Sequence, residues 1–127
     1  MGSTTKRNEN MNTTTLETMP PVTPSEKRTG PIEHVALFRW KEEASQEAID
    51  NALAELRKLK GKIPGLVDVS SKTNFSERAK GYTHVLIMRF ADRSALQAFG
   101  PHPEHQRVVQ NFVSPIRADS LVLDYEL

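Results

Sequence analysis

Three histidines stand where a polar ring must point into an apolar interior. His34 lies in the run Ile32–Trp40 and His84 in the run Tyr82–Phe90, and both runs are apolar on each face at the two-residue period of a β-strand. His105 opens a helical run whose other inward positions are apolar. Because imidazole titrates near neutral pH, a histidine at the mouth of an apolar cavity is suited to general base catalysis. We therefore take His105 as the candidate general base, and His34 and His84 as candidate ligand contacts.

Each of these histidines also has a purely structural interpretation. A buried neutral histidine bonded to one partner is common in cores, and this interpretation is favoured for His34 and His84. His105 can instead bond a loop carbonyl group, and His102 is the expected N-cap of the same helix. A histidine metal site is disfavoured, because His102 and His105 flank a proline at the helix start and the nearby Glu104 points elsewhere.

The elements that must position these side chains follow in the order strand, helix, strand, strand, helices, strand. The expected strands cover residues 32–40, 66–72, 82–90 and 120–127, and the expected helices have Ser45, Asp92 and His102 as N-caps. The strand at 66–72 is an edge candidate, because aspartate and serine dilute its apolar pattern. On the last helix, the inward face is expected to carry His105, Val108, Val109 and Phe112.

Two strand–helix–strand units, the second returning antiparallel, predict an α+β fold. We expect a ferredoxin-like, four-stranded antiparallel sheet with helices on one face. The other face would expose four apolar side chains: Val35, Leu37, Val85 and Ile87. A patch of this kind marks a partner surface, so we expect a homodimer in which two outer sheet faces pack together.

Composition and charge limit the classes of function. The 127 residues suffice for one domain, which we place at 31–127 after a disordered tail over 1–30 that is rich in polar residues and proline. The 17 basic and 16 acidic residues form no block of like charge, which argues against nucleic-acid binding. The absence of cysteine excludes disulfides and thiolate metal sites. No apolar run approaches the roughly 18 residues of a membrane span, so we expect a soluble, cytoplasmic protein without membrane contact.

Four segments together resemble the stress-responsive A/B barrel domain (Dabb) family. They are Glu33-His34-Val35-Ala36-Leu37-Phe38, Gly81-Tyr82-Thr83-His84-Val85, His102-Pro103-Glu104-His105 and Leu123-Asp124-Tyr125. The resemblance begins near Ile32 and extends to the C-terminus. It implies a dimeric α+β barrel, and many members are known only as heat-stable or stress-induced plant proteins or as unassigned microbial ones.

The family also implies a chemistry. Its best-defined enzyme, olivetolic acid cyclase, closes a linear polyketide by intramolecular aldol condensation without a cofactor. By that resemblance the catalytic histidine falls on His105, and two further cavity histidines fall on His34 and His84. The catalytic tyrosine falls on Phe99, which has no hydroxyl group and can donate neither a hydrogen bond nor a proton.

Three functions follow from these observations. The favoured one is a stress-response A/B barrel protein, a homodimer whose small apolar cavity binds a small metabolite. The alternative is a cofactor-independent polyketide cyclase or lyase-type enzyme, with His105 as general base and His34, His84 or Tyr82 orienting a carbonyl-rich substrate beside Phe99. A third, a haem-degrading or quinone-forming monooxygenase, rests on fold analogy alone.

Overall fold

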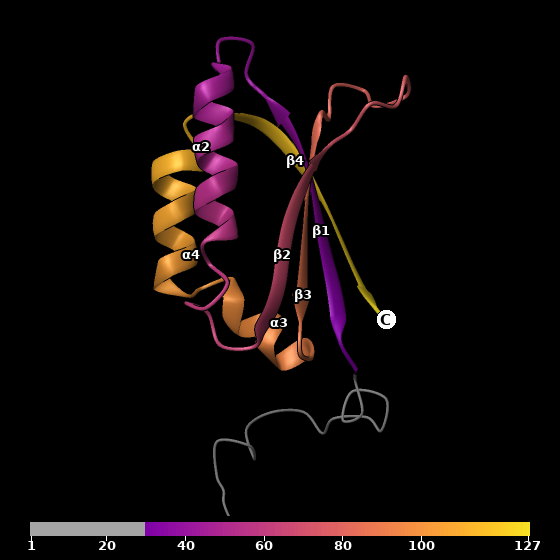
Figure 1. Cartoon of the computed structure of the whole chain (residues 1–127), viewed down its shortest axis with the longest axis vertical. Helices are drawn as coiled ribbons and strands as arrows, with labels where there is room; N and C mark the ends of the chain where they lie inside the picture. Colours follow the sequence, from indigo (N-terminus) through magenta and orange to yellow (C-terminus); the bar gives the residue numbers. More distant parts are fainter. Residues whose placement is uncertain (1–29) are drawn as a thin grey trace, which may run out of the picture.

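The structure is a computed structural model that describes residues 30–127, so the tail expected over 1–30 lies outside it except for Gly30. The elements are, in chain order, β1 (Ile32–Trp40), α2 (Gln46–Arg57), β2 (Leu66–Thr73), β3 (His84–Phe90), α3 (Arg93–Phe99), α4 (Pro103–Val108), the π-helix η3 (Val109–Val113) and β4 (Arg117–Glu126) (Figure 1). Within this part of the chain, no helix is long and apolar enough to cross a membrane.

The four strands form one antiparallel sheet in the order β2-β3-β1-β4. The helices α2 and α4 lie together on one side of it, and α3 closes one end (Figure 1). This arrangement confirms the predicted ferredoxin-like α+β fold and the edge position of β2.

The helices begin where the sequence predicts because their caps are satisfied. The side chains of Ser45, Asp92 and His102 each accept a hydrogen bond from a backbone N–H two or three residues further on, at 3.1, 2.9 and 3.1 Å. His102 is therefore the N-cap that the sequence indicated. Pro103 follows at the first helical position, where the missing N–H is harmless.

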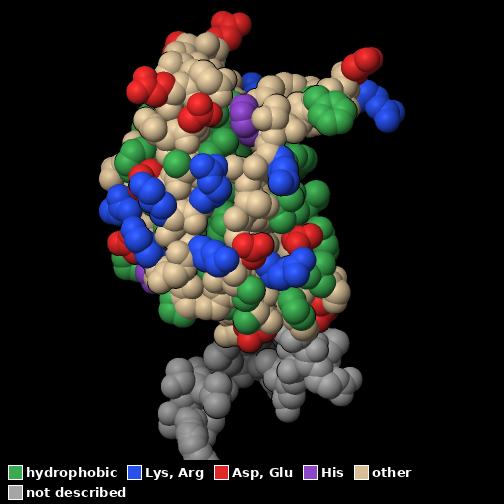
Figure 2. Space-filling model, viewed as in Figure 1, with side chains coloured by type: hydrophobic (Ala, Val, Ile, Leu, Met, Phe, Trp, Pro, Cys, Tyr) green, Lys and Arg blue, Asp and Glu red, His purple; other side chains and the backbone are tan. Residues whose placement is uncertain are grey.

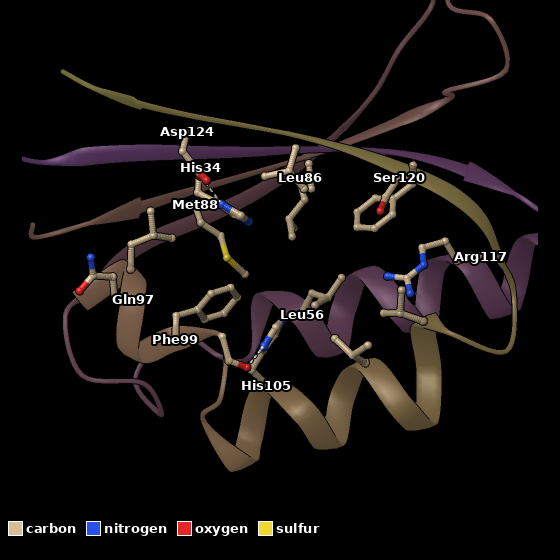
Figure 3. Close-up of a pocket in the computed structure, with 17 residues that line it drawn as sticks. His34, Leu56, Leu86, Met88, Gln97, Phe99, His105, Arg117, Ser120 and Asp124 are labelled. Atoms are coloured by element: carbon tan, nitrogen blue, oxygen red, sulfur yellow. Dashed lines mark hydrogen bonds and ion pairs between the residues drawn. The ribbon is translucent and has the colours of Figure 1, made fainter. Parts of the chain in front are cut away.

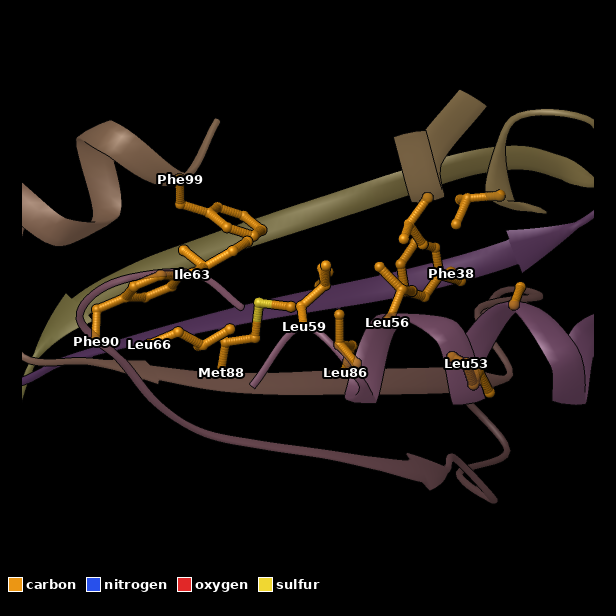
Figure 4. Close-up of a cluster of buried hydrophobic side chains, with 14 of the residues drawn as sticks. Phe38, Leu53, Leu56, Leu59, Ile63, Leu66, Leu86, Met88, Phe90 and Phe99 are labelled. Atoms are coloured by element: carbon orange, nitrogen blue, oxygen red, sulfur yellow. The ribbon is translucent and has the colours of Figure 1, made fainter. Parts of the chain in front are cut away.

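The core lies between the sheet and the helices (Figure 4). Its largest fully buried side chains are Leu59, Met88, Phe90, Val108 and Val113. Close packing extends to the turn before β2, where Gly65 has a φ of 82° and a Cβ atom on it would clash with the Cβ of Ala95. This contact sets how closely α3 approaches the sheet.

The end of the last helix differs from the prediction. After Val108 the helix continues as a π-turn, in which the Ser114 N–H donates to the carbonyl oxygen of Val109, five residues earlier. The extra residue in this turn rotates Val113 into the core, whereas Phe112, expected on the inward face, is only partly buried.

Two strand boundaries also differ. β3 begins at His84 and not at Tyr82, because Lys80 and Gly81 have positive φ angles and the Tyr82 N–H donates to the carbonyl oxygen of Ala79 in a turn. β4 begins at Arg117, three residues before the expected start at Ser120. A shift of register opposite Arg39 and Trp40 marks a β-bulge at this end of β4.

The sheet face away from the helices is apolar in its middle. Figure 2 shows green side chains along one edge of the molecule, on the side where the strands lie. Val35, Leu37, Val85 and Ile87 are half-buried there, and β4 adds Leu121, Leu123 and Tyr125, which are about half exposed. We call this set the outer face. Polar groups stand at both ends: the Tyr125 hydroxyl donates to Glu33 at 2.7 Å, and the Tyr82 hydroxyl donates to Asp119 at 2.6 Å.

Candidate functional site

A cavity of about 440 Å³ lies between the inner face of the sheet and the helices (Figure 3). Its wall is mostly apolar and comes from β1, β3, β4, α2, α3, α4 and η3. The lining residues are His34, Ala36, Phe38, Leu56, Leu86, Met88, Leu96, Gln97, Phe99, Gly100, His105, Val109, Val113, Arg117, Ser120, Val122 and Asp124. A volume of this size and a wall with few polar groups are typical of sites for small organic ligands.

His105 lies on α4, and one of its ring nitrogens is hydrogen-bonded to the backbone. Its Nδ1 lies 3.0 Å from the carbonyl oxygen of Gly100, and since a carbonyl oxygen only accepts, Nδ1 carries the proton. In the neutral ring Nε2 is therefore the atom with a free lone pair. Burial lowers the pKa of His105, and the bond to Gly100 opposes that effect only in part. The ring is thus neutral and able to accept a proton at neutral pH.

His34 forms a second polar centre with Asp124. Antiparallel pairing of β1 and β4 places the two residues directly opposite each other, and the Nδ1 of His34 lies 2.5 Å from a carboxylate oxygen of Asp124. The carboxylate holds the ring by one nitrogen and leaves Nε2 available, as the backbone carbonyl does for His105.

Phe99 connects the two histidines. Its ring centroid lies 4.0 Å from that of His105 and 5.7 Å from that of His34. The side chain is buried, so the position that the family resemblance assigns to a tyrosine contributes only an apolar surface between two imidazole rings.

The far end of the cavity carries a positive charge. Figure 3 shows the guanidinium group of Arg117 directed toward the middle of the cavity, at the end opposite Gln97, with Ser120 near it. Arg117 is the partner of Trp40 across the bulge, so the bulge brings this side chain to the inner face of the sheet.

The structure does not bring His84 to this cavity. His84 lies opposite Phe38 in the β1–β3 register, whereas His34 lies opposite Met88. The two histidines share a sheet face but are four residues apart along β1, a separation of about 13 Å at the rise of a strand. The Nδ1 of His84 accepts a hydrogen bond from the Trp40 indole at 3.0 Å, and burial lowers the pKa of His84. His84 lies in a smaller polar pocket beside α2.

Tyr82 is also absent from the cavity lining. Because it precedes β3, its side chain extends toward the end of the outer face, where it bonds Asp119 and lies under the guanidinium of Arg39. The role of Tyr82 as a ligand contact therefore stays a prediction, and in this structure its side chain lies outside the cavity.

Two charged residues of the cavity, Asp124 and Arg117, were not predicted from the sequence. Asp124 alternates with Leu123 and Tyr125 along β4, which indicates that it points inward, but its pairing with His34 depends on the strand register. Arg117 reaches the inner face only through the bulge. Among residues 30–127, no group of three histidine, aspartate or glutamate side chains is placed to hold a metal ion.

The fold and the cavity define a small α+β domain with a ligand-sized cavity on the inner side of its sheet. The model of the Stress responsive A/B Barrel Domain family matches residues 32–127. The chain is 32% identical over 94 residues to a stress-response A/B barrel domain-containing protein of Arabidopsis thaliana, a match that covers 74% of this chain and 36% of the longer plant protein. The chain belongs to the stress-responsive A/B barrel domain family, and it spans less than half the length of the curated relatives it matches.

Solved structures agree on the fold. A dimeric ferredoxin-like protein of unknown function from Jannaschia has a TM-score of 0.66 at 29% identity, over 77% of this chain and all of that one. The hydroxynitrile lyase of Passiflora edulis has a TM-score of 0.70 at 23% identity, over 78% of this chain and 94% of the lyase. Because the sequence identity to the lyase is only 23%, this similarity shows a shared fold alone.

Proposed function

We propose that the chain acts as a homodimeric binding domain for a small, largely apolar molecule that carries a polar group. The observation behind this proposal is the apolar cavity of about 440 Å³ into which two histidines present one uncommitted nitrogen each. An apolar molecule gains free energy by leaving water, and His105 gives it one directional contact.

The outer face supports the dimer. Seven apolar side chains from three neighbouring strands form one continuous patch there, with hydrogen-bonded polar clusters at its two ends. A self-complementary patch of this kind is what a two-fold interface requires. The Jannaschia protein with the same fold is dimeric.

A second candidate function is proton abstraction from a carbonyl compound, which the fixed tautomer of His105 favours. Nε2 would remove a proton from a carbon next to a carbonyl group, and the resulting carbanion would form a bond to a second carbonyl carbon of the same molecule. The alkoxide formed there would take the proton back from the His105 imidazolium. Because Phe99 cannot donate a hydrogen bond, the developing charge would have only His34 near it, and we expect slow turnover.

The binding function can be tested by native mass spectrometry of the full chain isolated from the cells that produce it. We expect a species of twice the 14.3 kDa chain mass together with a retained small molecule. Val122 lines the cavity but is 47% exposed, so Val122→Phe should fill the cavity without straining the core. This variant should lose the small molecule and keep the dimer.

A matched control is Ala98→Phe, which adds the same ring at an exposed position of α3 outside the cavity lining. It should retain the small molecule. If the wild type and Val122→Phe retain the small molecule equally, the cavity is not the binding site. If the wild type has the mass of a monomer, the proposed dimer is refuted.

A further inference from the structure

The wall of the cavity carries two charged side chains besides its histidines, and they have opposite signs. Asp124 lies at the His34 end, where its carboxylate accepts from the His34 ring. Arg117 lies toward the other end, and Figure 3 shows apolar side chains such as Leu86 and Leu56 between the two. The cavity is therefore polarised along its length, with an apolar middle.

Arg117 has no carboxylate partner within 4.0 Å among residues 30–127, whereas Asp124 has its histidine. The nearest acidic residue in sequence, Asp119, is bonded by the hydroxyl of Tyr82 and paired with the guanidinium of Arg39, and the charge of Arg117 acts on it only at a distance, as a minor cause of its lowered pKa. The donors of Arg117 thus remain available to a molecule in the cavity, and a guanidinium group matches a carboxylate in geometry and charge.

The bulge in β4 creates this arrangement. In a regular antiparallel ladder Trp40 would lie opposite Ala118, since Arg39 lies opposite Asp119, but the register shift makes Arg117 its partner. Arg117 is thereby placed on the inner face, where Ser120 of the same strand also lines the cavity and can donate from its hydroxyl group.

We propose that the natural ligand is an apolar carboxylic acid, bound with its carboxylate on Arg117 and Ser120 and its apolar part along the middle of the cavity. A hydroxyl group at its other end would donate a hydrogen bond to Nε2 of His105. The charges orient it, because a carboxylate is attracted by Arg117 and repelled by Asp124. This inference rests on the proposed binding function and adds to it the chemical class and orientation of the ligand.

The test uses three probes that share one chain and differ in charge: octanoate, octan-1-ol and octylamine. Trp40, the only tryptophan, stacks on Phe38 at 5.0 Å between ring centroids, and Phe38 lines the cavity, so tryptophan fluorescence can report binding to the full chain. At pH 7.5 and low salt, we expect octanoate to bind roughly tenfold more tightly than octan-1-ol, the equivalent of about 1.4 kcal/mol, and octylamine to bind most weakly.

Three variants identify the source of this preference. Arg117→Gln should bind octanoate and octan-1-ol within about twofold of each other, whereas Arg117→Lys should keep the preference because it keeps the charge. Arg107→Gln is the matched control, since Arg107 lies on α4 outside the cavity lining and pairs with Glu104. It should leave all three affinities unchanged.

The outcomes separate the two proposals. If the wild type binds octanoate and octan-1-ol equally, or if Arg117→Gln keeps the preference, the assignment to Arg117 is overturned while the binding function stands. If none of the probes binds, both proposals fail. Should Arg117→Gln not fold, the wild type decides: a preference carried by the carboxylate charge must shrink when the pH is lowered until octanoate is protonated, and one that does not shrink overturns the inference.

Discussion

The replacement of Leu123 by lysine tests the dimer with the least disturbance of the single chain. Leu123 lies on the edge strand β4, at one side of the outer face and opposite Val35 in the β1–β4 register. It is 50% exposed, so a lysine there can extend into solvent in the monomer. Surface changes of this kind usually alter the free energy of unfolding by no more than about 0.5 kcal/mol.

In a two-fold dimer the same change costs much more. Full burial of a leucine side chain is worth about 1.5–3 kcal/mol, and half of the Leu123 surface remains to be buried, so each chain loses about 1 kcal/mol of association free energy. The symmetry presents the substitution twice, which makes about 2 kcal/mol. Bringing two lysine charges into an apolar contact adds further kcal/mol, and a total of at least about 4 kcal/mol corresponds to a weakening of roughly a thousandfold in Kd.

Sedimentation equilibrium over a range of protein concentrations measures this change, with circular dichroism to show that the monomer remains folded. Ala98→Lys serves as the control, because it places the same charge at an exposed position on α3, away from the sheet. A Leu123→Lys protein that remains dimeric with the Kd of the wild type would refute the assignment of the outer face as the interface.

Three further predictions concern the cavity and its support. In a product assay, wild-type protein should cyclise a linear tetraketide very weakly, and His105→Ala should abolish this activity. Phe99→Tyr should raise the rate by a factor of about 10² to 10⁴, the range that acid–base groups contribute. Efficient turnover by the wild type would contradict this prediction. Burial lowers the folded-state pKa of His105 and His84 below the unfolded value of 6.5. As the pH falls, these histidines therefore take up protons more readily in the unfolded chain than in the folded one. The free energy of unfolding should accordingly fall as the pH drops from 7.5 through 6.5 and below. Urea titrations should show a shallower fall for His105→Gln, and an unchanged slope would mean that His105 is not desolvated. Gly65→Ala should lower the free energy of unfolding by about 2 kcal/mol or more, because it adds strain at positive φ and a clash with Ala95, and a change in Tm of less than a degree would argue against that packing.

The sequence predicted the order of the elements, the helix caps and the sheet face of His34 because these depend on local patterns. It did not predict which inward residues meet. His34 and His84 have the same strand pattern, yet the distance between them depends on how far β1 and β3 are shifted against each other, and strand periodicity carries no information about that shift. Only residues at matching register positions come together, as His34 and Asp124 do.

Irregular backbone accounts for the other differences. Lys80 and Gly81 have positive φ angles, so the loop before β3 continues through Tyr82 and this residue is not part of the strand. The bulge in β4 turns Arg117 toward the inner face of the sheet. The π-turn exchanges Phe112 for Val113 in the core. Each is a departure by one or two residues from an ideal period, and each decides which side chain reaches the cavity.

The strand β4 serves two surfaces at once. Ser120, Val122 and Asp124 line the cavity, while Leu121 and Leu123 alternate with them on the outer face. β4 is an edge strand that pairs only with β1, so a molecule that fixes its inner side chains also fixes the side that a second subunit would contact. A ligand that binds the cavity of paired chains more tightly than that of single chains would strengthen pairing by the same coupling free energy. Occupancy of the cavity would rise with protein concentration, as the population of paired chains rises.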